Sequence, residues 1–384
     1  MENTLMRGRK PAEVFPPGEF IKDELEERGW TQEDLADILG RDLRLVNEVI
    51  TGKRGVTPET AKGLGEAFGT TAEFWMNLEA AYRISLVHTS DSPVARRAAI
   101  YARAPVRIMI KRHWIEPSDN IEVLERRLLN FFQMKSLDEV PRFWAAARKS
   151  TTYEVHTPAQ NAWLFRARNL ALAVNAVPFT ETRFGQGLDR LRALLPSPEE
   201  IRHLPHIMAE SGIRFLIVEP LPQTRIDGAC FWLDSKSPVV VLSLRFDRID
   251  WFWYTLMHEL GHVKNKDGIN KNMPLDTDLV GEQAQALDDK PEFEKAADIF
   301  AAESLIPQVK LNDFIVRIHP LYSKKQIAGF ATLIGVHPGI VVGQLQHRQE
   351  ISYAQNRDML VKVRQIITGA TLTDGWGYSL PSSL

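Results

Sequence analysis

The sequence predicts a multidomain protein that is mainly α-helical and has one α+β part with a small sheet. Three observations support this class. From residue 12 to about 198, apolar residues recur at helical spacing between Gly and Pro interruptions. After Pro198, short apolar runs bounded by Ser, Pro and Asp predict strands. The apolar segment WFWYTLMHELGHV then predicts a helix, because neither Pro nor Gly interrupts it before Gly261.

The chain has 384 residues, which is enough for two or three domains of ordinary size. We divide it into an all-α domain at 12–83, a helical linker or middle region at 90–198, an α+β domain at 199–348 and a C-terminal extension at 349–384. The tail of the extension, from Thr371 onward, contains Gly, Ser and Pro, and we expect it to be loose.

Composition is typical of a globular protein in water, with 44% apolar residues, 25% charged residues and a net charge of −2. No apolar run approaches the length that spans a bilayer, and the start MENTLMRGRK has no apolar signal core. We therefore expect a cytoplasmic protein without a membrane partner. The single cysteine, Cys230, excludes an internal disulfide and cysteine-rich zinc fingers, and we interpret it as a small core residue on a strand.

Residues 12–83 predict five short helices. Gly29 ends the first, and Thr31 caps the second, whose first turn is acidic as the helix dipole favours. Gly40 ends the second helix, and the third, at 42–50, follows after a very short turn. Thr57 and Thr71 begin the fourth and fifth helices. Two short helices joined by a Gly-marked turn form the helix-turn-helix pattern.

The stretches WTQEDLADILG and RDLRLVNEVITGKRGVTPETAKGLGEAFG resemble the Cro/C1-type (XRE) helix-turn-helix family, and FGTTAEFWMNLEAAYRI resembles its HigA-like antitoxin branch. The resemblance implies that the third helix enters the major groove of double-stranded operator DNA. Acidic residues outnumber basic ones in residues 1–54, so a domain kept only for protein binding or dimerisation stays open. The residues implied to face bases are Gln32, Arg41, Arg44 and Asn47, with Lys53 and Arg54 on phosphates.

The middle region is less informative about function. SPVARRAAIYARAPVRIMIKRHWI is basic, and we interpret it as a solvated helix face, with nucleic-acid contact as the alternative. IEVLERRLLNFFQM and TPAQNAWLFRARNLALAV predict amphipathic helices. The block could position the following domain or hold a sensing pocket.

Strands are predicted at 213–218, 226–233 and 239–244, immediately before the HELGH helix. Most of them should pack against that helix. At most one can be an exposed edge, where an extended peptide would hydrogen-bond beside a metal site.

HELGH carries the predicted chemistry. His258 and His262 are four residues apart, about 400° of helix, so both imidazoles leave the same face and can bind one zinc ion. Glu259 lies roughly 100° round the helix, where it can reach a metal-bound water without coordinating the metal. This arrangement is typical of a metal-dependent hydrolase.

A second helix, EFEKAADIFAAESLIP, returns about thirty residues later and ends at Pro307. Glu294 would be the third ligand, leaving the fourth position to water. Asp298, one turn further, is placed to hold a ligating imidazole by its second nitrogen. The alternative is that both carboxylates form a solvated face. We interpret three further histidines as structural and leave the oxyanion donor unassigned, with Tyr322 as a guess; the histidines are His319, His337 and His347.

HELGH followed by E-x-x-A-D-x-F-A-A-x-x-L-I-P resembles the ImmA/IrrE family of metallopeptidases. The resemblance extends through GIRFLIVEP, RIDGACFWL and PVVVLSLRFDRID and covers roughly residues 200 to 345. It implies a zincin-like, gluzincin-type α+β domain in which His258, His262 and Glu294 hold Zn²⁺ and Glu259 is the general base. It also implies helix-turn-helix repressors as the substrate class.

Two functions are compatible with these features. The first is a DNA-binding transcription regulator whose zinc endopeptidase cleaves a protein in response to stress, the substrate being a repressor, this chain itself or an operon neighbour. The alternative is a HigA-like antitoxin and repressor that binds operator DNA and a toxin encoded nearby, with the peptidase fold serving as sensor or scaffold. A homodimer is compatible with both.

Overall fold

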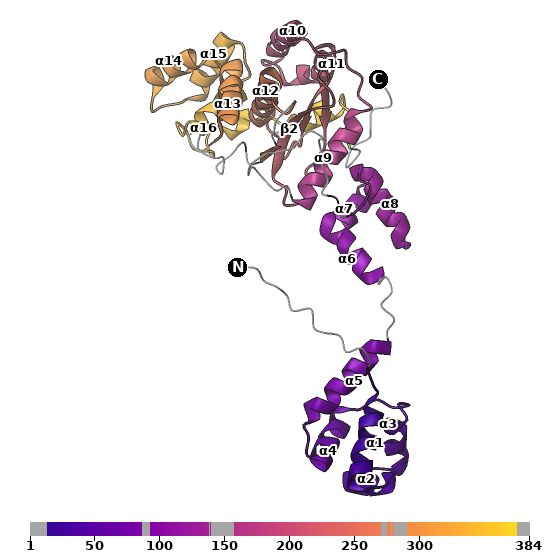
Figure 1. The fold of residues 1–384 in the computed structure, drawn as a ribbon. Helices are drawn as coiled ribbons and strands as arrows, with labels where there is room; N and C mark the ends of the chain where they lie inside the picture. Colours follow the sequence, from indigo (N-terminus) through magenta and orange to yellow (C-terminus); the bar gives the residue numbers. More distant parts are fainter. Residues whose placement is uncertain are drawn as a thin grey trace. The chain divides into compact units, whose positions relative to one another are not determined.

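The computed structural model describes residues 14–86, 93–137, 139, 157–269, 275–277, 279 and 290–374. The chain divides into two compact units, Met1–Ser92 and Pro93–Leu384. The first is helical and the second combines helices with a small mixed sheet (Figure 1). The predicted fold class is confirmed.

The first unit contains the five predicted helices, packed around a core that includes Leu35, Val46 and Trp75. A capping box between Thr31 and Asp34 begins the second helix, and Gly40, with a φ of 60°, ends it in the left-handed region that favours glycine. The helices are α1 (Pro17–Arg28), α2 (Gln32–Leu39), α3 (Leu43–Ile50), α4 (Pro58–Phe68) and α5 (Ala72–Leu86).

The sheet of the second unit has the strand order β1-β3-β2-β4. Strand β3 runs parallel to β1 and antiparallel to β2, and β4 pairs antiparallel with the other side of β2. Three strands are close to the predicted ones, whereas β4 was not predicted because its three residues lie in a polar stretch. The strands are β1 (Arg214–Ile217), β2 (Ile226–Trp232), β3 (Pro238–Leu242) and β4 (Leu275–Thr277).

Both faces of this sheet are covered. Side chains alternate along each strand: Phe215 and Val240 enter one core, whereas Leu216 and Val241 enter the other. The sheet is therefore the shared wall of two cores, and the middle helical region packs directly on it. The first core contains α10 (Glu181–Arg192), α11 (Leu204–Glu210) and α12 (Ile249–Asn265); the second contains α6 (Pro93–Arg103), α7 (Val106–Lys111), α8 (Ile121–Phe132) and α9 (Pro158–Ala171).

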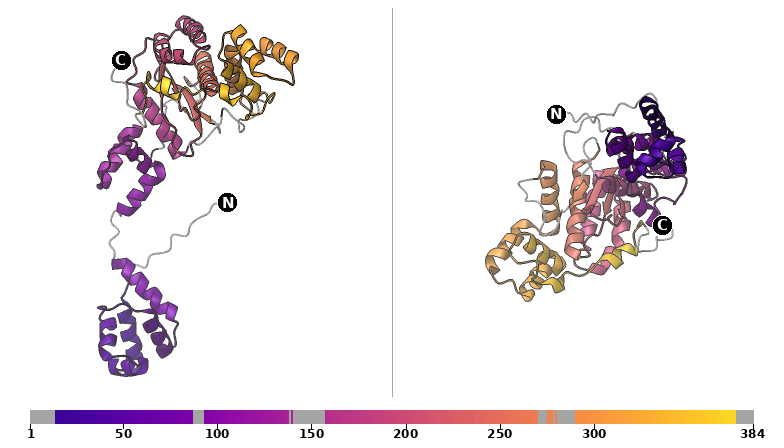
Figure 2. Two further views of the ribbon diagram at one scale, coloured as in Figure 1. Left: turned by 180° about the vertical axis from the view of Figure 1, so that it is seen from behind. Right: turned by 90° about the horizontal axis from the view of Figure 1, so that it is seen from below.

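Helix α12 lies between the sheet and a group of later helices (Figures 1 and 2). Gly261 permits its close contact with α13, because a Cβ there would lie 3.0 Å from the Ala297 Cα. His337 caps α16 by accepting the Gly339 amide, a structural role. The later helices are α13 (Glu292–Leu305), α14 (Gln308–Ile318), α15 (Lys324–Ile334) and α16 (Pro338–His347), and the remaining short helices are η1 (Pro198–His203), η3 (Arg357–Met359) and α17 (Arg364–Thr368).

The expectation of a loose tail from Thr371 is wrong for its first residues. Thr371, Thr373 and Asp374 are buried, and Thr373 forms a β-bridge with Ile217. Asp374 pairs with the buried Arg112 at 3.5 Å, so the end of the described chain is tied to α7 and the sheet. The rest of the predicted tail, 375–384, lies outside the described residues.

Cys230 is buried on β2, as a small core residue would be. Over the residues that the structure describes, no single helix is long and apolar enough to cross a bilayer. The bent pair α15–α16 passes that test by length and composition alone, and both helices contribute to the core around α12.

Candidate metal centre

Two helices and one strand bring four potential metal ligands together. His258 and His262 come from α12, Glu294 from the first turn of α13 and Asp276 from β4. One ligand atom from each lies within 4.8 Å of all the others. The three residues predicted as ligands are therefore neighbours, joined by a carboxylate that the prediction did not include.

The ring nitrogens converge closely. The Nε2 atoms of His258 and His262 are 3.0 Å apart, and Glu294 Oε2 lies 3.1 Å from the first and 3.6 Å from the second. Both imidazoles are fully buried and the Glu294 side chain is 16% exposed. These distances follow from the four-residue spacing on α12 and from the close packing of α13 permitted by Gly261.

The other nitrogen of each ring faces a carboxylate. His258 Nδ1 lies 2.9 Å from Asp298 Oδ1, which is the role predicted for Asp298, and His262 Nδ1 lies 3.0 Å from Asp267 Oδ2. Asp267 was not predicted. It follows Lys266, whose left-handed conformation ends α12 and turns the chain back toward the helix. The only feature of the sequence that could have indicated this role for Asp267 is its position as a polar residue just past the end of the helix that carries His258 and His262.

Asp276 is the potential ligand that sequence reasoning missed. Its Oδ1 lies 3.4 Å from His258 Nε2, and its Oδ2 lies 3.9 Å from His262 Nε2. Strand β4 carries it, and pairing with β2 brings it to the metal helix. The interval between two ligand-bearing helices is where a further acid could be sought, but no local spacing marks this one.

Glu259 sits beside the group and faces the carboxylate of Asp276. Its side chain is fully buried, and within the described part of the chain no donor group reaches either of its carboxylate oxygens. Gly228 on β2 gives it room, since a Cβ at that position would lie 2.2 Å from Glu259 Oε1. Burial raises the pKa of the Glu259 carboxyl well above its usual range, and the negative charge of Asp276 raises it further.

The charges of the ligands compensate one another. Burial lowers the pKa of His258, but Asp276, Asp298 and Glu294 outweigh this effect, and the pKa lies well above its usual range. Burial raises the pKa of Asp276, but His258 and His262 outweigh it, and the pKa lies below its usual range. The imidazoles and the carboxylates therefore stabilise each other's charged forms at short distance.

The donor set fits a zinc ion. When each Nδ1–H is donated to its carboxylate, both Nε2 atoms point a lone pair into the same small space, and lone pairs 3.0 Å apart repel unless a cation or proton lies between them. Two imidazole nitrogens with carboxylate oxygens are ligands that zinc prefers. The buried Asp276 Oδ2, which has no hydrogen-bond partner in the described chain, is directed to the same group.

The residues implied to contact DNA lie on α2, on α3 and in the turns that flank α3. Arg44 is 84% exposed and donates from Nε to Glu48 at 3.0 Å. Such an exposed pair is worth only about 0 to 1 kcal/mol, so Arg44 can exchange this partner for another anion. All except Gln32, which is half-buried, are exposed: Arg41, Arg44, Asn47, Lys53 and Arg54.

Tyr322 and His319 do not belong to the metal group. The Tyr322 hydroxyl donates to Glu350 Oε2, and His319 Nδ1 lies 3.3 Å from the same oxygen. Tyr254 donates its hydroxyl to Asp298 Oδ1 at 3.0 Å.

Two separate segments of the chain match families of known proteins. Residues 209–346 match the model of the peptidase family M78, described as the IrrE N-terminal-like domain. Residues 21–75 match a helix-turn-helix model. A segment of 88 residues is 31% identical to "Virulence-associated protein I" of Dichelobacter nodosus and covers 23% of this chain and 82% of that protein.

The chain belongs to the helix-turn-helix family and carries an IrrE N-terminal-like peptidase domain. The resemblances drawn from the two motifs are thereby confirmed. Solved structures similar to the helix-turn-helix part include an addiction module antidote protein of the HigA family from Coxiella burnetii, at 36% identity, and the antitoxin HigA of Pseudomonas aeruginosa, solved with the higBA promoter, at 35% identity. Each match covers 19% of this chain and 82% of the other, with a TM-score of 0.19.

Proposed function

We propose that this protein is a DNA-binding transcription regulator that carries a zinc-dependent endopeptidase. The observation that supports it best is the convergence of His258, His262 and Glu294 beside a buried carboxyl group, Glu259, whose oxygens receive no hydrogen bond from a donor among the described residues. A structural metal site does not need such a carboxylate, whereas hydrolysis needs a proton carrier next to the metal.

Each residue has a distinct task in this proposal. Zinc, when bound, supplies a Lewis acid that activates water and polarises a carbonyl. Glu259 accepts the proton of the attacking water and delivers it to the leaving amine. Burial, which raises its pKa, suits it to hold that proton between the two steps. Asp298 and Asp267 hold the two imidazoles in the tautomer that leaves Nε2 for the metal.

Asp276 determines whether the site is open. Three protein ligands leave a position for water, whereas four close a tetrahedral zinc site. Asp276 Oδ1 lies 3.4 Å from His258 Nε2, so Asp276 would be able to supply a fourth ligand and close the site when a metal is bound. We infer that hydrolysis requires Asp276 to give up its position, so that the peptidase is held at low activity until a signal arrives.

The substrate in this proposal is an extended protein segment. Within the described sheet, β4 is the strand at the metal side, and its outer edge can pair with a peptide by strand addition. A peptide bound there would run beside Asp276 and the ligand group. The proposed substrate is a repressor, this chain itself or an operon neighbour, and stress is the proposed trigger.

We infer that the helix-turn-helix unit binds operator DNA and that the protein acts in the cytoplasm. Arg44 and Asn47 are three residues apart on α3 and share an exposed face. Arg44→Ala and Asn47→Ala should each weaken binding to the protein's own promoter by about 1 to 3 kcal/mol in a gel shift, while zinc content stays the same. Unchanged promoter binding in both variants would show that α3 does not read DNA.

Glu259→Gln tests the peptidase. The amide has nearly the same shape but cannot carry the proton, so zinc content and promoter binding should match the parent while hydrolysis falls about 100-fold or more. The purified protein is incubated with proteins encoded next to it, with and without chelator, and products are identified by mass spectrometry. A reporter strain extends the test, because the variant should repress normally and fail to release under the inducing stress.

Normal induction by Glu259→Gln with zinc still bound would reject the peptidase. That outcome would favour the other function, a HigA-like antitoxin and repressor in which the metal domain acts as sensor or scaffold. Toxin binding by the parent and by the variant, measured with the neighbouring gene product, would then identify the partner. His258→Ala and Glu294→Ala should lose zinc under either function, so metal content in these two variants tests the site alone.

A further inference from the structure

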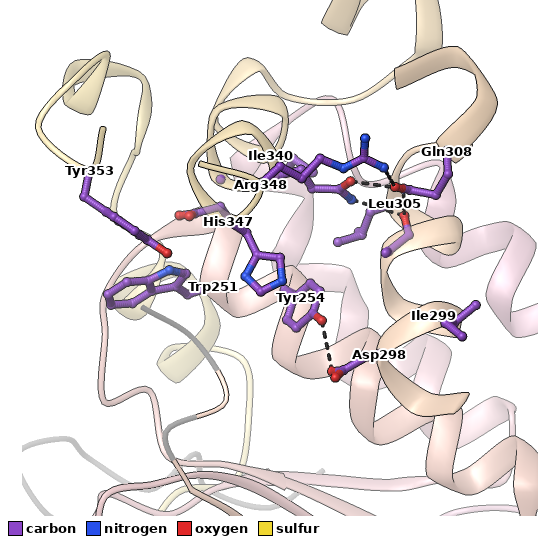
Figure 3. A pocket seen from close by; sticks show the side chains of 14 residues that line it. Trp251, Tyr254, Asp298, Ile299, Leu305, Gln308, Ile340, His347, Arg348 and Tyr353 are labelled. Carbon is purple, nitrogen blue, oxygen red and sulfur yellow. Dashed lines mark hydrogen bonds between the residues drawn. The ribbon is translucent and has the colours of Figure 1, made fainter. Parts of the chain in front are cut away.

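A cavity of about 270 Å³ lies next to the metal centre, and Asp298 is one of the residues that line it. Helices α12, α13 and α16 form it, together with the segment that contains Tyr353 (Figure 3). None of the four potential metal ligands lines it. The volume is below the range of roughly 300 to 1,000 Å³ that is usual for drug-sized ligands, so its occupant is small.

The walls are largely apolar and aromatic. Ile299, Leu305 and Ile340 contribute aliphatic surface, and Trp251 and Tyr353 contribute aromatic surface (Figure 3). A ligand with an apolar or flat aromatic body would bury that body against these side chains.

His347 lines the cavity with an imidazole that solvent also reaches. No hydrogen bond joins its ring to any other residue in the described chain, and the ring lies beside Tyr254 with centroids 6.1 Å apart. Its side chain is exposed, so it stands at the solvent side of the cavity. Burial lowers the pKa of His347, so the neutral ring offers one donor and one acceptor.

Arg348 supplies the positive charge of the cavity. Its guanidinium donates to Gln308 Oε1 and to Asn312 Oδ1, both neutral groups, and it forms no ion pair with a carboxylate in the described residues. The two acids that line the cavity already have cationic partners, since Asp250 pairs with Arg248 at 2.7 Å and Asp298 with a lysine at 2.6 Å. The charge available to a ligand is therefore that of Arg348.

A short hydrogen-bond path joins the cavity to the metal centre. The Tyr254 hydroxyl lines the cavity and donates to Asp298 Oδ1 (Figure 3), the same oxygen that lies 2.9 Å from His258 Nδ1. A ligand that accepts the Tyr254 hydroxyl would leave Asp298 Oδ1 to His258 alone. Stronger hydrogen bonding at Nδ1 makes the opposite nitrogen a better metal ligand.

We propose that this cavity is an effector site for a small carboxylic acid with an apolar or aromatic body, and that its occupancy raises zinc affinity through Tyr254, Asp298 and His258. Arg348 binds one oxygen of the carboxylate, the Tyr254 hydroxyl donates to the other, and the body of the ligand packs against the apolar and aromatic walls, with His347 at the solvent side. The acid is either a free molecule or the C-terminal residue of a peptide, which present the same chemistry. Ligand binding stands independently of peptidase activity, and only the coupling rests on the proposed zinc site.

Calorimetric titration of the full chain tests the site with three probes. Indole-3-acetate represents a free acid, the peptide Ala-Ala-Ala-Phe represents a peptide terminus, and 2-phenylethanol lacks the charge. At least one acid should bind saturably, 2-phenylethanol should bind much more weakly, and Arg348→Gln should lower acid affinity about tenfold or more, the scale of a lost charged hydrogen bond. Arg317→Gln, an exposed arginine of α14 outside the cavity, is the matched control and should not change binding.

The two acids differ in what they identify. Tighter binding of indole-3-acetate indicates a free effector, and tighter binding of the peptide indicates a protein end. Failure of both acids to bind, or equal binding to Arg348→Gln and the parent, would overturn the site. Retained folding of Arg348→Gln is checked by its thermal melt, and His347→Leu provides a second variant that should also weaken binding.

The coupling has a separate measurement. Zinc affinity, determined by competition with a chromogenic chelator, should rise severalfold when the acid saturates the parent. Tyr254→Phe removes the linking hydroxyl; it should bind the acid more weakly and, at saturating acid, show no rise in zinc affinity. Equal zinc affinity with and without bound acid in the parent would refute the coupling. Absence of zinc binding altogether would refute the proposed metal site instead, so the two failures are distinguishable.

Discussion

Replacement of Asp298 by Asn tests whether the carboxylate behind His258 controls the metal centre. Asp298 accepts three contacts at once: His258 Nδ1 at 2.9 Å, the Tyr254 hydroxyl at 3.0 Å and Lys290 Nζ at 2.6 Å. An amide has one carbonyl oxygen, and its NH₂ group cannot accept a hydrogen bond. The carbonyl oxygen of the Asp298→Asn side chain could accept either from His258 and Tyr254 or from Lys290. Its NH₂ group would then face the donors on the other side.

The size of the effect follows from this loss. A hydrogen bond to a charged group contributes about 1.5 to 3 kcal/mol, and removal of a carboxylate that orients a metal-binding histidine typically weakens metal binding about 10- to 100-fold. At about 1.4 kcal/mol per tenfold change, the second range is about 1.4 to 2.8 kcal/mol. Because the two ranges overlap, we expect Asp298→Asn to bind zinc about 10- to 100-fold more weakly and Glu294→Ala to lose more.

The assay is competition for zinc between the full chain and a chromogenic chelator, with metal content measured after dialysis. Glu292→Gln is the control, because Glu292 lies on the first turn of the same helix, is 91% exposed and pairs only with Lys295 among the contacts of the described chain. It should bind zinc like the parent. If Asp298→Asn also binds zinc like the parent while Glu294→Ala does not, Asp298 does not orient His258 and the reasoning is refuted.

Three further substitutions and one labelling experiment test other parts of the structure. Asp276→Ala should keep one zinc per chain and raise basal hydrolysis of a protein substrate; lower hydrolysis would contradict its closing role. Gly228→Ala should displace Glu259, because its Cβ would lie 2.2 Å from Oε1, and should reduce hydrolysis while zinc remains. Cys230 should resist iodoacetamide in the native protein and react after unfolding, as mass spectrometry can show, because burial raises its pKa well above the usual range. Asp374→Ala should lower the free energy of unfolding by about 1.5 to 3 kcal/mol in a urea titration, the scale of a lost hydrogen bond between charged groups, while Arg112 keeps its bonds to the carbonyl oxygens of Glu219 and Pro220; an unchanged midpoint would contradict this.

Local periodicity accounts for what could be predicted at the metal centre. His258 and His262 share a face because their spacing matches the helical repeat, and Glu294 and Asp298 share a face of α13 for the same reason. The helices of the first unit were predictable from caps and glycines, as Thr31 and Gly40 show. In each case the information lies within a few residues of the position concerned.

Contacts between distant segments required the tertiary structure. Asp276 reaches the ligands only because β4 pairs with β2, and three residues in a polar stretch carry no periodic signal of that pairing. Residues 371–374 look like a loose tail, yet a β-bridge to Ile217 and an ion pair with Arg112 bury them. The cavity that Asp298 helps to line likewise depends on how α12, α13 and α16 pack. The sequence by itself determined which residues share a helix face, because that depends on local backbone geometry, whereas only the tertiary structure decided which faces meet, because that depends on packing between segments far apart in the chain.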